Sequence, residues 1–303
     1  MTLITVDKDV YGRPLKAPVQ VDRMKWTNLQ ELKKWIDNDW DNVGFYTGME
    51  GAGKSEHSME SSLLIHHRLE LKDVFFNAKQ FKEWVDYAKP GTAGIWDEGD
   101  QLSGHWAGEM IRSLKRKMKQ MRDKNLTLFI NTPTIEDLGK YFVVHRTRFL
   151  FYTFARGPDN RGWYHMFGYE KKHDLFLAIK KYGETKKTHD YAKADITNGY
   201  FKGISNQECV KNNNGDWKTL LEFSQEEYKA KKDAARREEE KEPETKADIQ
   251  KEVLARTIVN AERMNEIKQL GLTNKEIATL IGIGNTSYYK YRKFAEEEGY
   301  YAR

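Results

Sequence analysis

The chain contains few residues of the kinds that form disulfides, metal clusters or membrane spans. Cys209 is the single cysteine among 303 residues, which excludes an intramolecular disulfide and a cysteine-cluster metal site. The eight histidines show no metal-ligand spacing. The longest apolar runs have the length of a strand, whereas a bilayer span needs about 20 residues, and the first residues lack a basic-then-apolar signal pattern. We therefore expect no membrane association and a cytoplasmic location.

Positively charged residues only slightly outnumber negatively charged ones. The 51 Lys and Arg residues against 46 Asp and Glu residues give a formal net charge of +5 at pH 7. This is a modest bias toward anionic partners and does not by itself identify a nucleic-acid binder. A chain of this length holds one sizeable core and a small second domain.

The most informative motif is G-x-x-x-x-G-K-S at residues 48–55. An apolar run at residues 43–47 precedes it, and residues 55–65 follow without Gly or Pro, so the sequence predicts a strand, a glycine loop and a helix. Backbone N–H groups of such a loop turn inward on an anion, and the helix N-terminus adds partial positive charge. The motif predicts that ATP binds to Gly48, Met49, Glu50, Gly51, Ala52, Gly53, Lys54 and Ser55.

Two adjacent carboxylates follow a second predicted strand. Asp97 and Glu98 come directly after the apolar residues 93–96. Mg²⁺ takes oxygen ligands, so Ser55 and Asp97 are the predicted metal ligands. Lys54 would reach the outer phosphates, and Glu98 would orient or deprotonate the attacking water. A base next to the metal-binding carboxylate favours an NTP hydrolase over a kinase.

Polar and cationic residues follow a third predicted strand at residues 126–130. Asn131 is the candidate that senses the γ-phosphate, with Thr132 as second choice; alternatively, Asn-Thr-Pro only caps the strand and turns the chain. Arg146 and Arg148 come later, and either would serve a neighbouring subunit as a finger that stabilises transition-state charge. The alternative is that these arginines simply flank a strand.

The order of these parts resembles a known family. It is similar to the additional-strand, catalytic-glutamate division of P-loop NTPases. Within residues 40–155, the stretches Trp96-Asp97-Glu98-Gly99-Asp100 and Asn131-Thr132-Pro133 resemble FtsK–HerA-type DNA motors, packaging ATPases of viruses and plasmids, and zonula-occludens-toxin-like phage assembly ATPases. Many DNA motors have Gln in place of Asn131, and the toxin-like members usually have a membrane-spanning segment. The resemblance implies a homo-oligomeric ring, with viral or plasmid proteins as partners and the host cytoplasm as location if the protein is viral.

Positive charge is concentrated in residues 108–125, a predicted helix. Its apolar residues recur at intervals of three and four and form a stripe that would dock on the sheet. The rest of its surface is basic, and Arg116 and Lys119 are candidate contacts to a phosphate backbone. Alternatively, this face contacts an acidic neighbouring subunit or is simply solvated.

The region after the predicted ATPase core changes in character. Residues 148–154 and 162–169 predict a β-hairpin, because the residues between them are rich in turn formers. Residues 183–215 are polar, and residues 229–246 carry alternating blocks of charge. We interpret residues 183–248 as an exposed connection.

The last part of the chain has the pattern of a helix-turn-helix module. Thr273 and Glu276 form a capping box, and Gly282 permits a tight turn. Residues 270–295 resemble the modules of small DNA-binding regulators, resolvases and some terminase subunits, with Tyr288 packed inward. If the second helix enters the major groove, its first residues face base edges: Asn285, Thr286 and Ser287. Its later residues would then contact phosphates: Tyr289, Lys290, Arg292 and Lys293. The alternative is a helical hairpin that docks protein.

These patterns together predict an α/β fold. It comprises a mostly parallel P-loop NTPase sheet flanked by helices, a β-hairpin extension and a small C-terminal all-α helix-turn-helix domain. The expected parts are an N-terminal helical extension (1–38), the ATPase domain with the hairpin (39–182), the connection (183–248) and the helix-turn-helix domain (249–303).

Three classes of function remain open. The favoured one is a Mg²⁺-dependent ATPase coupled to double-stranded DNA, as in a viral or plasmid packaging or translocation motor. The second is a regulatory or assembly NTPase whose nucleotide state switches oligomerisation and whose C-terminal module docks protein. The third is a small-molecule kinase, against which the adjacent Asp97 and Glu98 and the appended module argue.

Overall fold

The computed structural model shows two compact units, Met1–Glu238 and Glu239–Arg303. Each unit has its own hydrophobic core. The structure describes residues 2–38, 40, 42–98, 108–135, 140–157, 161–182, 197–241, 254–255, 257–262, 264–265 and 270–297.

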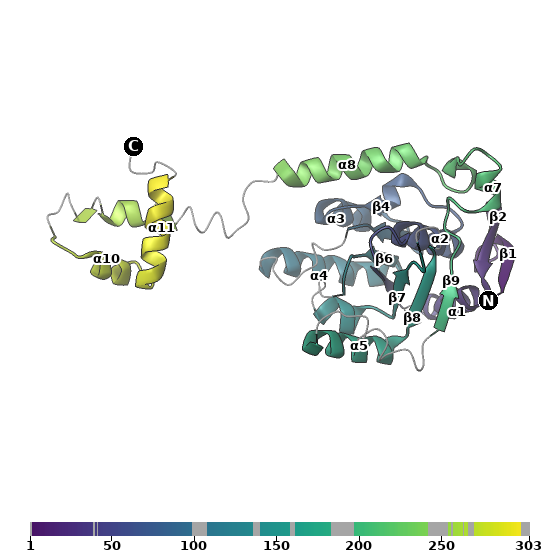
Figure 1. The fold of residues 1–303 in the computed structure, drawn as a ribbon, viewed down its shortest axis with the longest axis horizontal. Coiled ribbons are helices and arrows are strands. Elements are labelled where there is room, and N and C mark those ends of the chain that lie inside the picture. Colours follow the sequence, from purple (N-terminus) through teal and green to yellow (C-terminus); the bar gives the residue numbers. More distant parts are fainter. Residues whose placement is uncertain are drawn as a thin grey trace. The chain divides into compact units, whose positions relative to one another are not determined.

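A seven-stranded sheet forms the centre of the first unit (Figure 1). Its order is β4-β5-β6-β3-β7-β8-β9; the strands from β4 to β7 are parallel, and β8 is antiparallel to both of its neighbours. The mostly parallel sheet predicted from the sequence is confirmed, and β6 is an additional strand between β3 and β5. The strands are β3 (Asn42–Gly48), β4 (Val74–Phe75), β5 (Ala93–Trp96), β6 (Thr127–Asn131), β7 (Phe149–Phe154), β8 (Trp163–Phe167) and β9 (Thr197–Tyr200).

Helices cover both faces of this sheet, and alternate strand residues fill the two cores. Tyr46 and Phe129 belong to one core, whereas Phe45 and Ile130 belong to the other. Since parallel strands are buried on both faces, they read as continuous apolar runs. The first core includes residues of α1 (Arg23–Asp37) and α2 (Lys54–His66); the second includes residues of α3 (Ala78–Tyr87), α4 (Gly108–Asp123), the π-helix η3 (Tyr141–Arg146) and α5 (Tyr169–Tyr182).

The basic helix and the hairpin are both present. Leu114, Met118 and Met121 of α4 are buried in the second core, as predicted for its apolar stripe. Strands β7 and β8 form the predicted antiparallel hairpin. The hairpin is not an extension, however, because β7 also pairs with β3 and is thus part of the central sheet.

The N-terminal region is not only helical. Strands β1 (Leu3–Lys8) and β2 (Pro14–Asp22) form an antiparallel pair before α1 begins. Val19 and Val21 are buried, which matches the alternation of apolar and polar residues in a half-buried strand. Asp22 then caps α1 by accepting a hydrogen bond from the Met24 amide.

The segment that we interpreted as an exposed connection packs in large part onto the first unit. It contributes β9, α7 (Glu208–Lys211), the 3₁₀-helix η5 (Trp217–Thr219) and α8 (Gln225–Lys241). Phe201, Trp217 and Tyr228 are buried in the first core, together with apolar residues of the same segment: Ile204, Val210, Leu220, Leu221 and Phe223. These side chains anchor a segment that is otherwise largely polar, and the first unit extends to Glu238.

The second unit is helical where it is described. Helix α10 (Asn274–Leu280) starts with the predicted capping box of Thr273 and Glu276. Gly282, with a φ of +75°, lies before α11 (Asn285–Glu297). Tyr288 is fully buried in this core, as predicted. No helix in the described ranges of either unit is long and apolar enough to cross a membrane.

Candidate nucleotide-binding site

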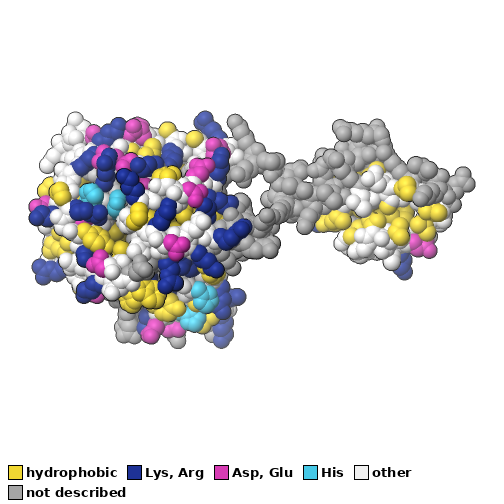
Figure 2. Space-filling model, turned by 180° about the vertical axis from the view of Figure 1, so that it is seen from behind, with side chains coloured by type: hydrophobic (Ala, Val, Ile, Leu, Met, Phe, Trp, Pro, Cys, Tyr) yellow, Lys and Arg dark blue, Asp and Glu magenta, His cyan; other side chains and the backbone are white. Residues whose placement is uncertain are grey.

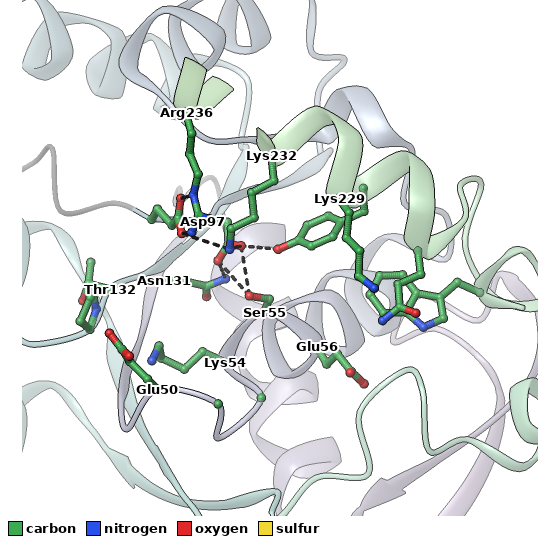
Figure 3. A pocket seen from close by; sticks show the side chains of 17 residues that line it. Glu50, Lys54, Ser55, Glu56, Asp97, Asn131, Thr132, Lys229, Lys232 and Arg236 are labelled. Carbon is green, nitrogen blue, oxygen red and sulfur yellow. Dashed lines mark hydrogen bonds and ion pairs between the residues drawn. The ribbon is translucent and has the colours of Figure 1, made fainter. Parts of the chain in front are cut away.

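A cavity of about 510 Å³ opens at the carboxyl ends of the central strands (Figure 3). The glycine loop follows β3, Asp97 follows β5, and Asn131 is the last residue of β6. Because parallel strands end at the same edge of the sheet, three segments that are distant in sequence meet there, at the place where open α/β sheets bind ligands.

Two glycines give the loop its shape. Gly48 has a φ of +122°, and a Cβ at this residue would lie 2.1 Å from the carbonyl oxygen of Thr153. Gly53 has a φ of +94° and is the N-cap of α2, where no side chain caps the helix. The first amides of α2 are therefore available to an anion. This backbone fits a nucleotide phosphate.

Lys54, the first residue of α2, folds back over the loop. Its Nζ donates to the carbonyl oxygens of Gly48 (2.8 Å) and Met49 (3.0 Å). Burial lowers the pKa of the Lys54 ammonium, while the charge of Asp97 opposes this shift. A phosphate would offer the ammonium charged oxygen acceptors, which make stronger hydrogen bonds than carbonyl groups.

Ser55, Asp97 and Asn131 form a network beside the loop (Figure 3). Ser55 Oγ lies 3.0 Å from Asp97 Oδ1 and 3.1 Å from Oδ2. Asn131 Nδ2 donates to Asp97 Oδ1 (2.8 Å) and to Ser58 Oγ (3.0 Å). Asn131 Oδ1 is buried and lacks a hydrogen-bond partner among the described residues.

This set of oxygen atoms fits Mg²⁺ bound together with phosphates. Within the described ranges, no group of three or more His, Cys, Asp or Glu side chains is placed to hold a metal ion. Mg²⁺ is usually bound through one or two carboxylates, with phosphate and water oxygens completing the octahedron. Ser55 and Asp97 would supply the protein ligands, and Asn131 Oδ1 offers an acceptor for a water molecule.

Glu98 directly follows Asp97 and has an unusual backbone conformation. Its φ is +61°, a left-handed conformation that costs a non-glycine residue about 1–3 kcal/mol. Its carboxylate lies at the pocket, where Arg236 Nε is 3.1 Å from Oε2 and Lys232 Nζ is 3.1 Å from Oε1. The predicted base is thus at the site, and it is paired with two cations of α8.

The sensor and finger candidates lie in different places. Thr132 lines the pocket, but its Oγ1 donates to the carbonyl oxygen of Thr134 (2.9 Å). Arg146 is not among the residues that line the pocket, and its Nη2 donates to the Met118 carbonyl oxygen (2.8 Å).

Arg148 lies at the opposite edge of the sheet. It precedes β7, whose Phe149 pairs with Gly44 near the start of β3, whereas the glycine loop is at the other end of β3. Its guanidinium lies 4.6 Å from the ring centroid of Trp35 and 4.5 Å from that of Trp40. In this arrangement, Arg148 does not contact the nucleotide pocket of its own chain.

Among the lining residues that were not predicted from the sequence, six share one origin: Trp217, Gln225, Tyr228, Lys229, Lys232 and Arg236. All of them come from the segment that we interpreted as a connection. The available signal was the spacing of Tyr228, Lys232 and Arg236, which places three hydrogen-bond donors on one face of a helix. The spacing alone does not predict which hydrogen-bond acceptors this face of the helix contacts.

The DNA-contact candidates are largely accessible. Arg116 and Lys119 are exposed on α4, which connects β5 to β6. In the face that Figure 2 shows, Lys and Arg side chains of the first unit are interspersed with Asp and Glu. In the second unit, Arg292 is half-buried, and its Nε donates to Glu262 Oε1 at 3.0 Å. The other predicted contacts of α11 are exposed, apart from the half-buried Ser287: Asn285, Thr286, Tyr289, Lys290 and Lys293.

Comparison with solved structures finds partial and distant similarity. The N-terminal domain of zonular occludens toxin from Neisseria meningitidis has 16% identity and a TM-score of 0.33, over 50% of this chain and 98% of that chain. The DNA-packaging ATPase from Sulfolobus turreted icosahedral virus has 12% identity and a TM-score of 0.34, over 54% and 98%. A chain of the HORMA:CdnC:Trip13 complex from E. coli MS115-1 has 12% identity and a TM-score of 0.33, over 58% and 73%.

No protein-family model and no curated protein matches the sequence. The architecture is a P-loop NTPase-like α/β fold, as the sheet order and the glycine loop between β3 and α2 show. The function rests on the geometry of the site.

Proposed function

We propose that this protein is a Mg²⁺-dependent ATP hydrolase coupled to double-stranded DNA. The observation that carries the proposal is the meeting of the glycine loop, the Ser55–Asp97 pair and Glu98 at one edge of the sheet. This arrangement supplies a phosphate cradle, oxygen ligands for a metal and an adjacent carboxylate base. The kinase alternative lacks support, because a kinase does not need a base that activates water.

Each residue of the site has a defined task in this proposal. The amides of the loop and Lys54 Nζ would bind the phosphates, and Ser55 and Asp97 would hold the metal. When bound, Mg²⁺ neutralises the charge that develops on the phosphate oxygens. Glu98 would take a proton from the attacking water, and Asn131 would orient that water.

Coupling to DNA is the finer part of the proposal. Arg116 and Lys119 are exposed on α4, the helix between the strand that precedes Asp97 and the strand that ends at Asn131. A phosphate backbone bound there would act on both strand ends. In the second unit, the exposed residues of α11 would provide the DNA contact. We propose a packaging or translocation motor of a viral or plasmid kind, assembled as a homo-oligomeric ring in which Arg146 or Arg148 faces the site of a neighbouring subunit.

The alternative is a nucleotide-switched assembly NTPase whose second unit docks protein. Steady-state ATP hydrolysis with and without double-stranded DNA, at two salt concentrations, separates the two functions. A DNA motor shows DNA-stimulated turnover that salt suppresses, since phosphate contacts weaken with salt. A rate of ATP hydrolysis that does not change when DNA is added, together with nucleotide-dependent oligomerisation, would favour the assembly NTPase.

Two variants test the site itself. Glu98→Gln should retain nucleotide binding and lose turnover by about 10²–10⁴-fold, because the amide cannot accept the proton of water. Lys54→Ala should weaken nucleotide binding, because it removes the cation that reaches the phosphates. Hydrolysis at the wild-type rate by Glu98→Gln would remove Glu98 from the role of base.

A further inference from the structure

Helix α8 lies beside the nucleotide pocket and presents one row of side chains to it (Figure 3). We call Tyr228, Lys232 and Arg236 the α8 row. These residues are spaced by four, so they share one face of the helix. The row faces Asp97 and Glu98, the two acidic residues on which the proposed function depends.

Every member of the α8 row contacts one or both of these acids. The Tyr228 hydroxyl donates to Asp97 Oδ2, and burial raises the pKa of Tyr228, so the phenol keeps its proton. Lys232 Nζ lies 3.4 Å from Asp97 Oδ2 and 3.1 Å from Glu98 Oε1. Arg236 donates to both carboxylate oxygens of Glu98 through Nε (3.1 Å) and Nη2.

These contacts conflict with the tasks proposed for the two acids. Asp97 already accepts from Ser55 and Asn131, so the row takes up its remaining capacity for a metal ion. Both oxygens of the Glu98 carboxylate accept from the Arg236 guanidinium, which leaves fewer of their lone pairs for a water molecule. In addition, the ammonium of Lys232 repels any second cation that approaches the same oxygen atoms.

We propose that Lys232 and Arg236 of the α8 row compete with Mg²⁺·ATP for Asp97 and Glu98, so that α8 restrains the site until nucleotide displaces its last turns, while Tyr228 stays anchored. This inference rests on the proposed function. Competition of this kind is reciprocal. The factor by which release of α8 raises the affinity for Mg²⁺·ATP equals the factor by which bound Mg²⁺·ATP raises the equilibrium constant for release of α8.

The two halves of α8 are held in different ways, which defines the part that moves. Tyr228 is buried with its ring 5.5 Å from Phe76 and 5.8 Å from Trp217, and Lys231 Nζ donates to the Leu71 carbonyl oxygen at 2.8 Å. After the buried Ala235, residues 236–238 are exposed. The first half is therefore anchored by packing, whereas the contact of Arg236 with Glu98 holds the later turns.

Matched variants of neighbouring arginines test the competition. Arg236→Met and the double variant Lys232→Met/Arg236→Met remove the contacts, and Arg237→Met removes an equal charge from the next, exposed position. We would measure the Kd of a fluorescent ATP analogue with Mg²⁺, and amide hydrogen exchange of residues 225–238 with and without nucleotide. Exchange of β3 and α2 verifies that each variant is folded.

The double variant should bind Mg²⁺·ATP about tenfold more tightly, a typical size for coupled sites. Exchange at residues 232–238 should increase in the double variant without nucleotide, and in the wild type only after nucleotide is added. Arg236→Met should show part of both effects, and Arg237→Met neither.

Two outcomes would overturn the competition while leaving the proposed function intact. If the double variant binds the fluorescent ATP analogue with Mg²⁺ more weakly than the wild type does, the α8 row is a phosphate ligand. If all variants bind as the wild type does, α8 does not restrain the site. By contrast, absence of Mg²⁺·ATP binding in the wild type and in the double variant alike would reject the proposed function itself.

Discussion

At the end of β6, two neighbouring polar residues have different surroundings. Asn131 donates to Asp97, and its own Oδ1 is buried without a hydrogen-bond partner in the described structure. Thr132 lines the same pocket, but its hydroxyl is used within the turn, where it donates to Thr134. The contacts therefore favour Asn131 as the residue that reports on the γ-phosphate.

This difference predicts unequal effects of substitution. Asn131→Ala should lower the rate of ATP hydrolysis by about 10²-fold with little change in nucleotide Kd, because the lost groups act on the developing charge and the attacking water. Thr132→Val, the matched control, should retain turnover within about twofold, because only a turn contact is lost. Single-turnover kinetics and equilibrium binding give the two quantities. A larger loss in Thr132→Val than in Asn131→Ala would reverse the assignment.

Among the elements, helices α1 and α2 are joined by a buried ion pair. Lys25 Nζ donates to Glu60 Oε1 at 2.7 Å, and both side chains are fully buried. Glu60 Oε2 also accepts from the Gly203 amide at 3.0 Å, which ties the segment after β9 to the same pair. Burial lowers the pKa of Lys25, while Glu60 opposes this shift. The Glu60 carboxylate thus joins three segments: α1, α2 and the residues after β9.

Removing one partner of this pair should be costly. Lys25→Met leaves Glu60 buried without its cation and should lower the free energy of unfolding by about 3–5 kcal/mol. Lys25→Met/Glu60→Gln should lose less, since no unpaired charge remains and the amide oxygen still accepts from Gly203. Urea unfolding followed by tryptophan fluorescence reports on the first unit alone, because all eight tryptophans lie within residues 26–217.

The control is an exposed pair on the same helix. Lys34 and Glu31 have side chains that are 67% and 57% exposed, so Lys34→Met should cost at most about 1 kcal/mol. Equal losses in Lys25→Met and the double variant would show that no uncompensated charge is left at Glu60.

At the scale of the whole molecule, two cations of the second unit differ in their surroundings. Lys290 of α11 is exposed, whereas Arg292 is tied to Glu262 at 3.0 Å and to Glu296 at 3.5 Å. From the sequence, we predicted both residues as phosphate contacts. Lys290 is the more exposed of the two, whereas the Arg292 guanidinium is held by carboxylates of its own unit.

These two cations should therefore respond differently. If the second unit binds DNA, Lys290→Met should reduce the slope of log K against log salt by about 0.9, the value for one phosphate contact. Arg292→Met should leave this slope unchanged and lower the thermal stability of the second unit. Fluorescence anisotropy with labelled duplex DNA at several salt concentrations measures the slope. Binding that is absent or insensitive to salt would favour a protein partner.

The local parts of the site could be predicted from the sequence alone. Strand, glycine loop and helix are encoded by adjacent residues, and glycine is the residue type that adopts the positive φ values of this loop without steric cost. Asp97 and Asn131 were also predictable, because each follows an apolar run that becomes a parallel strand, and parallel strands end at one edge. The capping box at Thr273 is local in the same sense.

The residues that contact these local parts from distant segments of the chain follow from the tertiary structure and could not be predicted. Arg148 was a finger candidate for a neighbouring subunit by its position in the chain, and only the register of β7 against β3 shows that it lies away from the pocket of its own chain. Tyr228 is 131 residues from Asp97 in the sequence, and a helix of mixed charge gives no sign of which acid it faces. Aromatic anchors such as Trp217 bring α8 to the pocket by burial, which is non-directional. Local geometry is fixed by neighbouring residues, whereas the pairing of distant charges is fixed by packing, and packing depends on the whole chain.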